Sequence, residues 1–312
     1  MQSLRFAIVC FALSLFLLLN ACKAKENISK TIIVDQSGGG NFTKVQEAID
    51  SIPSNNGLWT SIHVKAGEGS NVTLIQWGDF GSSSDSSTFK MYADNFVACD
   101  ISFKNTHNHP LLLDVDHNVT WAPAALIQGD KASFHRCGFI GLQDTLADWQ
   151  RRHYFVNCYI EGAVDFIWGG GQSIYQNCNI NVTKSRIGSG NAYIAAQGRG
   201  TATDPSGFVF KDCVVFGTGP AFLGRAYGSY SRVVFYESHF DDIITPEGWD
   251  AWFSRGKEGT LTNSEVQCMG PGASMLNRVK WEKTLTVEAL GQLVNLKSFI
   301  NQESWIESQP IF

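Results

Sequence analysis

The feature of the sequence that most constrains its fold is a short recurring pattern: an aromatic residue, a cysteine three positions later and an apolar residue two positions after that. Five cysteines occupy this pattern, and a sixth copy has serine in their place. The copies are Phe96/Cys99/Ile101, Phe134/Cys137/Phe139, Phe155/Cys158/Ile160, Tyr175/Cys178/Ile180, Phe210/Cys213/Val215 and Phe235/Ser238/Phe240. The cysteines lie 38, 21, 20 and 35 residues apart, and self-similar units of this size are typical of solenoids.

Each repeat unit is a short run of strand-forming residues that ends in Gly, Asn or Asp, and the shortest units leave no room for a helix. We therefore predict an all-β fold, a right-handed parallel β-helix whose repeated apolar positions stack into interior ladders. Small thiols fit such a ladder, so we expect buried cysteines that are mostly free. The even count of six cysteines after residue 24 leaves a disulfide framework as the alternative.

Both ends of a solenoid need covering. Near the start, Thr43 and Gln46 have the spacing of a capping box, and apolar residues recur at helical intervals up to Pro53, which predicts a short N-terminal capping helix. After Trp281 the apolar spacing changes again, and residues 287–305 are expected to form a helical and irregular cover over the flank or the far end.

Residues 1–24 have the pattern of a secretory signal peptide, because Arg5 precedes a 14-residue apolar run and small residues follow it. The remainder, residues 25–312, is expected to form one domain around a single large core. A formal net charge of −5 without a basic run argues against a nucleic-acid partner. Sequons that fit a secreted glycoprotein occur at Asn27, Asn41, Asn71, Asn118 and Asn181.

Two aspartates occupy equivalent positions on successive units: Asp144 lies seven residues after Cys137, and Asp165 lies seven residues after Cys158. Because strands of adjacent coils are about 4.8 Å apart, the two carboxyl groups are expected to lie within a few ångströms of each other. Two such groups cannot both ionise easily, so one can donate a proton while the other acts as nucleophile or base. The apolar surroundings of Asp165 call for a cationic partner, and Arg225 is our candidate. Taken singly, each aspartate would be an ordinary turn residue. Their repetition at the same position of successive units favours a catalytic role.

Four segments resemble motifs of the plant pectin methylesterases (pectinesterases), and the resemblance extends from about Thr31 to Trp305. It is to the short class, which has no inhibitor-like region before the catalytic domain. The segments are Gly141-Leu142-Gln143-Asp144-Thr145-Leu146, Gly162-Ala163-Val164-Asp165-Phe166-Ile167-Trp168-Gly169, Leu223-Gly224-Arg225-Ala226-Tyr227 and Gly248-Trp249-Asp250-Ala251-Trp252.

This resemblance implies a carboxylic-ester hydrolase that removes methyl esters from cell-wall pectin. Asp165 would attack the ester carbonyl while Arg225 holds it ionised, and Asp144 would protonate the departing methanol and then activate water. Gln143 would donate to the oxyanion. No metal or organic cofactor is implied.

The resemblance also implies that methylated homogalacturonan is bound by Arg225 and by aromatic faces at Tyr227, Trp249 and Trp252. For the aromatic residues, ordinary burial is the alternative. His153 lies on the strand that leads to a repeat cysteine, and we expect it to be structural. The protein is expected to be a secreted, extracellular monomer of the cell wall, and a proteinaceous pectinesterase inhibitor is a further candidate partner.

The sequence departs from the family pattern at two places. Trp121 stands where the family usually has a second oxyanion glutamine, and losing one such donor typically lowers turnover by about 10²–10³. The chain also passes from Lys65-Ala66-Gly67 directly to Glu68, where about one early coil of the family is expected.

These departures motivate the main alternative, a catalytically weak or inactive pectin-binding homologue. A β-helix glycosidase or a pectate lyase is a third hypothesis, and a lyase would need a calcium site of clustered acids. The aspartate pair has no further acidic cluster beside it.

Overall fold

The computed structural model describes residues 28–65, 73–108 and 119–310, and the chain divides into two compact units. In the first unit, strands β1 (Ile28–Val34) and β2 (Trp59–Val64) pair in parallel. Helix α2 (Val45–Asp50) packs its Ala48 against their buried side chains. The predicted signal peptide and the junction after Gly67 lie outside the described residues.

The N-terminal helix is confirmed, but its predicted capping box is wrong. Helix α2 begins after Lys44, and no side chain caps it. The amide of Gln46 instead donates to Asp50 Oδ1 at 2.7 Å, one helical turn further along. No helix in the described part of the chain is long and apolar enough to cross a membrane.

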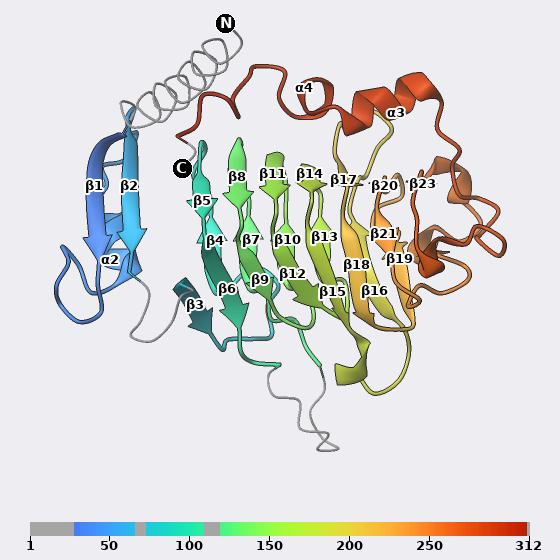
Figure 1. Ribbon diagram of the computed structural model, residues 1–312, viewed down its shortest axis with the longest axis horizontal. Coiled ribbons are helices and arrows are strands. Elements are labelled where there is room, and N and C mark those ends of the chain that lie inside the picture. The colour runs from blue at the N-terminus through green and yellow to red at the C-terminus, as the bar shows by residue number, and fades with distance from the viewer. Residues whose placement is uncertain (1–27, 66–72, 109–118, 311–312) are drawn as a thin grey trace, which may run out of the picture. The chain divides into compact units, whose positions relative to one another are not determined.

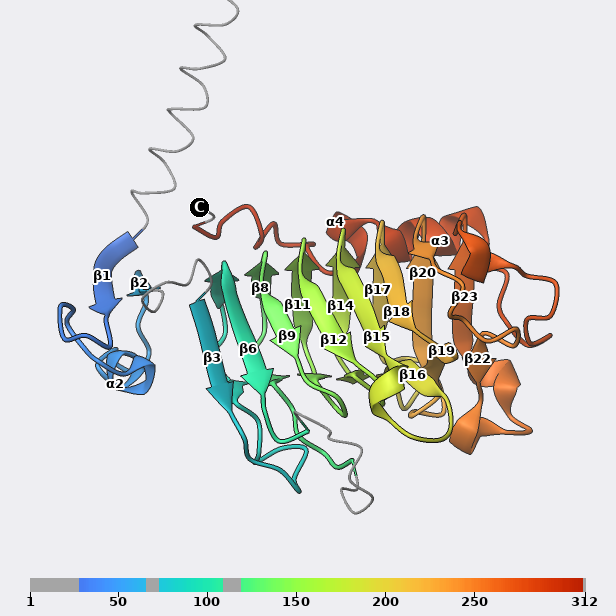
Figure 2. The same cartoon turned by 60° about the horizontal axis from the view of Figure 1, so that its bottom comes forward.

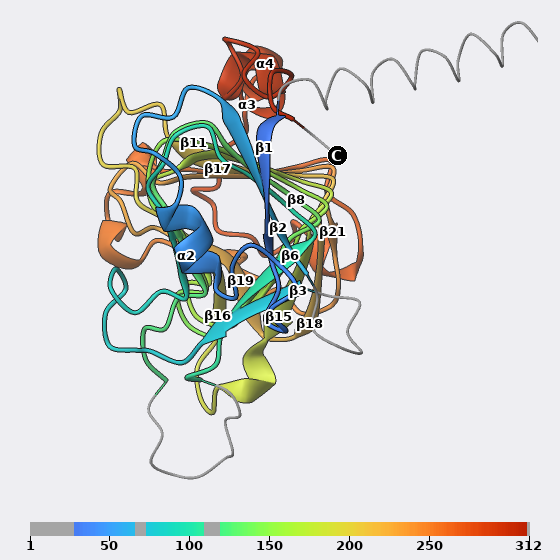
Figure 3. The same ribbon diagram turned by 90° about the vertical axis from the view of Figure 1, so that its left-hand side faces the viewer.

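The second unit, Leu74–Ile306, is the predicted parallel β-helix, with three seven-stranded parallel sheets along its length (Figures 1 and 2). Viewed end-on, the strands of each sheet lie one behind another (Figure 3). The first sheet contains β4 (Phe89–Met91), β7 (Ala125–Ile127), β10 (Leu146–Asp148), β13 (Ile167–Gly169), β16 (Ala192–Gln197), β19 (Ala221–Arg225) and β22 (Trp249–Asp250). The second contains β5 (Val97–Cys99), β8 (Ala132–His135), β11 (Arg152–Val156), β14 (Gln172–Gln176), β17 (Gly207–Lys211), β20 (Arg232–Tyr236) and β23 (Thr262–Val266). The third contains β3 (Thr73–Trp77), β6 (Ile101–Asn105), β9 (Gly138–Ile140), β12 (Tyr159–Gly162), β15 (Asn179–Thr183), β18 (Val214–Thr218) and β21 (His239–Phe240).

The repeated cysteines form an interior ladder and are free, as expected. The thiols of Cys158, Cys178 and Cys213 reach back to a main-chain carbonyl of the preceding coil, for example Cys158 Sγ to Phe134 O at 3.3 Å and Cys213 Sγ to Tyr175 O at 3.3 Å. Ser238 does the same with its hydroxyl, which explains why serine replaces cysteine in the sixth copy. The repeat thus selects a small side chain that can donate a hydrogen bond.

The first predicted copy of the repeat is two residues out of register with the other copies. Cys99 pairs with His135 at the end of its strand, so Ile101 and not Cys99 falls beside Cys137. Cys268 joins the ladder at the other end, donating to Phe235 O at 3.5 Å. The pattern misled because Phe96 precedes the stacked position by two residues and still contacts Phe134, with ring centroids 5.7 Å apart.

Aromatic rings form a second ladder beside the thiols. Phe134, Phe155, Tyr175, Phe210 and Phe235 stack with successive centroid distances of 5.0, 4.6, 4.6 and 4.4 Å. These spacings are those of neighbouring parallel strands, so the ladder fixes the register of the coils.

The C-terminal segment covers a flank of the β-helix. Helices α3 (Val287–Val294) and α4 (Leu296–Phe299) lie along the outer side of the second sheet (Figure 1). Leu293, Phe299 and Trp305 pack on outward-facing apolar residues of β11, β14, β17 and β20. Short helical turns complete the loops: η1 (Lys184–Arg186) follows β15, η2 (Trp252–Ser254) and η3 (Glu258–Thr260) follow β22, and η4 (Pro271–Ala273) follows β23.

Candidate active site

The two aspartates stack on adjacent coils of the first sheet. Leu146 of β10 pairs with Ile167 of β13 in parallel register, which places Asp144 beside Asp165. The Asp144 N–H donates to Val164 O at 3.0 Å. Both aspartates have left-handed backbone, with φ of 60° and 47°, a conformation that Asp adopts more readily than most residues. The left-handed residue therefore turns each coil just before its strand, with a carboxyl group at the turn.

Arg225 holds Asp165 in a two-point contact. Its Nε donates to Asp165 Oδ1 at 2.6 Å and its Nη2 donates to Oδ2. Arg225 ends β19, two coils beyond Asp165, and its guanidinium extends past Tyr193 of β16 on the intervening coil. The sequence predicted this partner.

Two aromatic rings sandwich the Arg225 guanidinium. Its Cζ lies 4.2 Å from the centroid of the Tyr193 ring and 3.8 Å from that of Trp252. Cation–π contacts of this kind stabilise a cation and restrict its side chain. Tyr193 is not among the site residues predicted from the sequence. Its position could have indicated it, because the register of β13 with β16 makes Tyr193 the counterpart of Asp165 on the next coil.

The electrostatics separate the two carboxyl groups. Burial, and next the charge of Asp165, raise the pKa of Asp144 to about 8, against the opposing effect of Arg225. Burial also raises the pKa of Asp165, while the hydrogen bonds and charge of Arg225 lower it. A guanidinium that donates to both oxygens stabilises the ionised carboxylate. We therefore assign the charge of the pair to Asp165 and the proton to Asp144.

Gln143 and Trp168 frame the aspartate pair. Gln143 is half-buried and directly precedes Asp144. The Trp168 indole N–H donates to the main-chain oxygen of Asp144 at 3.2 Å. Trp168 also packs edge-on against Trp149 and Tyr227, with centroids 5.3 and 6.5 Å apart. The turn that carries Asp144 is thus anchored by the neighbouring coil.

The three aromatic residues expected to bind substrate lie in different environments. Tyr227 is 52% exposed and its ring centroid lies 5.8 Å from that of Trp252. Trp252 is partly exposed and stacks on Arg225. The expectation for Trp249 is wrong: it is 1% exposed and packs against Phe235 in the core, because the last coil needs a large side chain to close the interior. Trp249 therefore belongs to the core, although it also borders the pocket that Tyr193 and Phe222 line.

Trp121, at the place of the expected glutamine, is 49% exposed. Its main-chain oxygen accepts from the Gly81 N–H at 3.0 Å. A tryptophan can donate only through its indole N–H, so Trp121 does not reproduce an amide donor.

His153 is a structural residue, as expected. It is fully buried, with Nδ1 2.5 Å from Asp148 Oδ1 and Nε2 2.9 Å from Gly129 O. The Tyr175 hydroxyl donates to Asp148 Oδ2 at 2.6 Å. This network joins three coils beneath the first sheet, and none of its groups is exposed.

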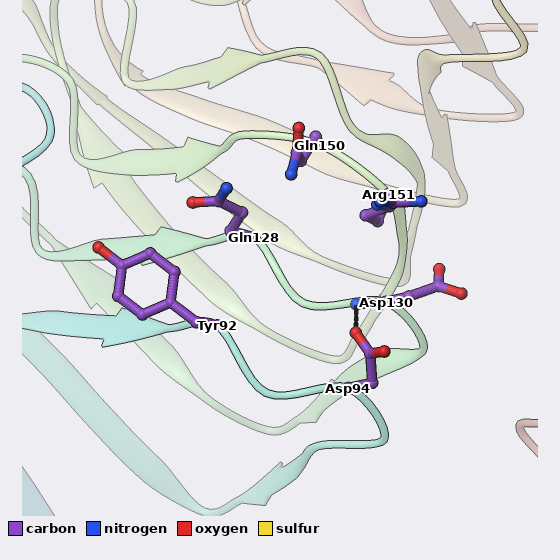
Figure 4. A pocket seen from close by; sticks show the side chains of 6 residues that line it. All are labelled: Tyr92, Asp94, Gln128, Asp130, Gln150 and Arg151. Atoms are coloured by element: carbon purple, nitrogen blue, oxygen red, sulfur yellow. Dashed lines mark hydrogen bonds between the residues drawn. The ribbon is translucent and has the colours of Figure 1, made fainter.

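A second feature of this side of the molecule is a polar pocket of about 290 Å³ at the carboxyl ends of β4, β7 and β10. Figure 4 shows Tyr92, Gln128 and Gln150 on three successive coils, with Arg151 beyond them. Asp94 also lines the pocket, and its Oδ1 accepts from the Asp130 N–H at 2.7 Å (Figure 4). No group of three or more metal-ligating side chains occurs in the part of the chain that the structure describes.

A parallel β-helix with two stacked aspartates, one of them held by an arginine, is an arrangement that suits a hydrolase. Comparison with known proteins agrees. The pectinesterase family model matches residues 66–303. The chain is 46% identical to "Probable pectinesterase 29" of Arabidopsis thaliana over 98% of each chain. The solved pectin methylesterase from carrot is 28% identical, with a TM-score of 0.82 over 90% of this chain and 96% of that one.

The chain belongs to the pectinesterase family. A pectin methylesterase solved in complex with a hexasaccharide shares the fold, at 21% identity and a TM-score of 0.70 over 86% of this chain and 96% of that one.

Proposed function

We propose that this pectinesterase removes methyl esters from pectin through Asp165 as nucleophile and Asp144 as acid and base. The observation that carries the assignment is the two-point contact of Arg225 with Asp165 beside the buried Asp144, whose pKa burial and the charge of Asp165 raise to about 8. One carboxylate is then ready to attack, and its neighbour holds the proton that the leaving group needs.

In the first step, an Asp165 oxygen attacks the ester carbonyl and a tetrahedral intermediate forms. The side-chain amide of Gln143 would donate to its oxyanion. The intermediate collapses as the C–O bond to the methoxy group breaks, and Asp144 gives its proton to the departing methanol. The product on the enzyme is a mixed anhydride between Asp165 and the uronate.

In the second step, Asp144, now ionised, removes a proton from water. The hydroxide attacks the uronate carbonyl of the anhydride, the bond to Asp165 breaks, and the uronic acid leaves and releases its proton to the solvent. Asp144 regains its proton and Asp165 regains its contact with Arg225, so the cycle closes without a net change in the enzyme.

The exposed aromatic residues near the pair suit a polysaccharide. Tyr227 is 52% exposed and its ring would stack on a galacturonate ring. Trp252 lies beside it and stacks on both the Arg225 guanidinium and Phe253, so it would border the substrate mainly with its ring edge. Methylated homogalacturonan would be the substrate, and the extracellular cell wall the place of action. A monomer, with a proteinaceous inhibitor as a further partner, completes the proposal.

Methanol release from highly methylated pectin tests this assignment. The wild-type protein is compared with Asp165→Asn, which keeps the shape of the side chain but removes the nucleophile. Asp242→Asn, at an exposed aspartate, is the matched control. We expect release by the wild type and the control and none by Asp165→Asn. A folded wild-type protein that releases no methanol would instead be the pectin-binding homologue.

A further inference from the structure

Two of the sequons lie in the described part of the chain, and their asparagines have different surroundings. Asn41 is exposed in the loop between β1 and α2, whereas Asn181 is half-buried in the middle of β15. The sequons at Asn27, Asn71 and Asn118 lie outside the described residues. An N-linked glycan replaces one hydrogen of the side-chain amide nitrogen and leaves the side-chain oxygen able to accept. The hydrogen bonds of that nitrogen therefore decide whether the folded protein accommodates a glycan.

The Asn41 amide is anchored through its oxygen. Oδ1 accepts from the Ile33 N–H at 2.8 Å, and the Asn41 main-chain N–H donates back to Ile33 O at 2.7 Å. Nδ2 makes no hydrogen bond to another residue of the described chain, and both Asn41 and Thr43 are exposed. A sugar on Nδ2 would leave the contact with Ile33 intact and would extend from a side chain that is already held in place.

The Asn181 amide is anchored through its nitrogen instead. Nδ2 donates to the Tyr159 hydroxyl at 2.8 Å and to Glu161 Oε2 at 3.2 Å. The Tyr159 hydroxyl donates to the same Glu161 oxygen at 2.6 Å, and Arg186 Nη1 lies 3.5 Å from Glu161 Oε1. The side chains of Arg186 and Glu161 are only 20% and 15% exposed. Both amide hydrogens of Asn181 thus belong to a partly buried polar cluster.

A glycan on Asn181 would break this cluster. Asn181 pairs in register with Glu161 of β12 and Phe216 of β18, so a sugar would have to lie over the neighbouring strands. It would also remove one of the two amide hydrogens, so either Tyr159 or Glu161 would lose its donor. A polar group left unpaired in such a site is costly, most of all a charged one. Because the glycan is attached before folding is complete, this cost would act against folding and secretion of the modified chain.

We propose that Asn41 carries an N-linked glycan in the secreted protein and that Asn181 stays unmodified. The donor would be an oligosaccharide joined through a diphosphate to a lipid, with N-acetylglucosamine at its reducing end. The bond from Asn41 Nδ2 to C1 of that sugar forms, the C1–O bond to the diphosphate breaks, the lipid diphosphate leaves, and the amide proton passes to a base of the transferase. The inference rests on the proposed extracellular location, because this transfer takes place in the secretory pathway.

Peptide mapping of the full-length protein secreted by cultured plant cells tests both parts of the proposal. An N-glycosidase that accepts plant glycans is applied in heavy-oxygen water, so each glycosylated asparagine becomes an isotope-labelled aspartate that mass spectrometry detects. Thr43→Ala destroys the sequon but keeps the Asn41 amide and its contact with Ile33. Thr43→Ser keeps a sequon and is the matched control. Thr183→Ala destroys the sequon of Asn181 in the same way.

We expect the label at Asn41 in most molecules and at Asn181 in almost none. Thr43→Ala should lose the label at Asn41 and the mass of one glycan, Thr43→Ser should keep both, and Thr183→Ala should keep every glycan. Equal labelling of Asn41 and Asn181, or a secreted protein that releases methanol without a label at Asn41, would overturn the inference and leave the proposed function standing. A secreted protein that is labelled at Asn41 but releases no methanol would contradict the proposed function alone.

Discussion

Replacing Asp144 with asparagine should stabilise the protein while it abolishes turnover. Asp144 is 7% exposed, and its pKa is raised from 3.8 to about 8, first by burial and then by the charge of Asp165. Below pH 3.8 the carboxyl group is protonated in both the folded and the unfolded chain. Between pH 3.8 and 8 the unfolded chain ionises and the folded one does not, so stability falls as pH rises.

The size of the effect follows from these two pKa values. Each pH unit in that interval costs about 1.4 kcal/mol, so Asp144 destabilises the folded state at pH 7 by about 4 kcal/mol relative to pH 3.8. Asparagine fills the same volume but has no titratable carboxyl group, so this pH-dependent destabilisation is absent from the Asp144→Asn variant. The stability difference between Asp144→Asn and wild type should therefore grow by about 1.4 kcal/mol per pH unit from pH 5 to pH 8.

Urea unfolding, followed by tryptophan fluorescence at several pH values, measures this difference. Asp242→Asn removes an exposed carboxylate and should give a curve parallel to wild type at every pH. If Asp144→Asn were also parallel to wild type between pH 5 and pH 8, Asp144 would not carry the proton and the roles assigned to the pair would be wrong.

Three further predictions concern the arginine contact, the thiol ladder and the aromatic residues. Arg225→Lys keeps a positive charge but loses the two-point contact, so kcat should fall at least about tenfold; equal kcat would show that the planar geometry is unimportant. Cys178→Ser should change the free energy of unfolding by less than about 1 kcal/mol, because Ser238 performs the same role two coils further along the ladder, whereas Cys178→Leu should overpack the ladder at a cost of about 1–3 kcal/mol. Trp249→Ala should cost about 3–5 kcal/mol in thermal or urea unfolding, while Tyr227→Ala should leave stability unchanged and raise KM; the reverse pattern would contradict their assigned places.

The sequence predicted much of the site because a solenoid converts spacing into position. In a parallel β-helix, residues at equal distances from a repeated mark fall on the same row, so the offset of seven residues placed Asp144 beside Asp165. The predicted register was wrong where the aromatic-x-x-Cys pattern did not coincide with the stacked position. Cys99 lies two residues from its expected place, because Ala98, and not Phe96, pairs with Phe134 of the next coil.

The amino-acid sequence by itself determined the coil period, the interior ladder of small donors and aromatic rings, and the stacked aspartates, since each follows from local strand formation and periodic burial. Only the tertiary structure decided which aromatic side chains face the solvent. Trp249 closes the core and Tyr193 supports Arg225, although both are aromatic residues on strands of the same sheet. The physical reason is that burial depends on what the neighbouring coils and the C-terminal loop leave uncovered. Side-chain type and spacing do not contain that information.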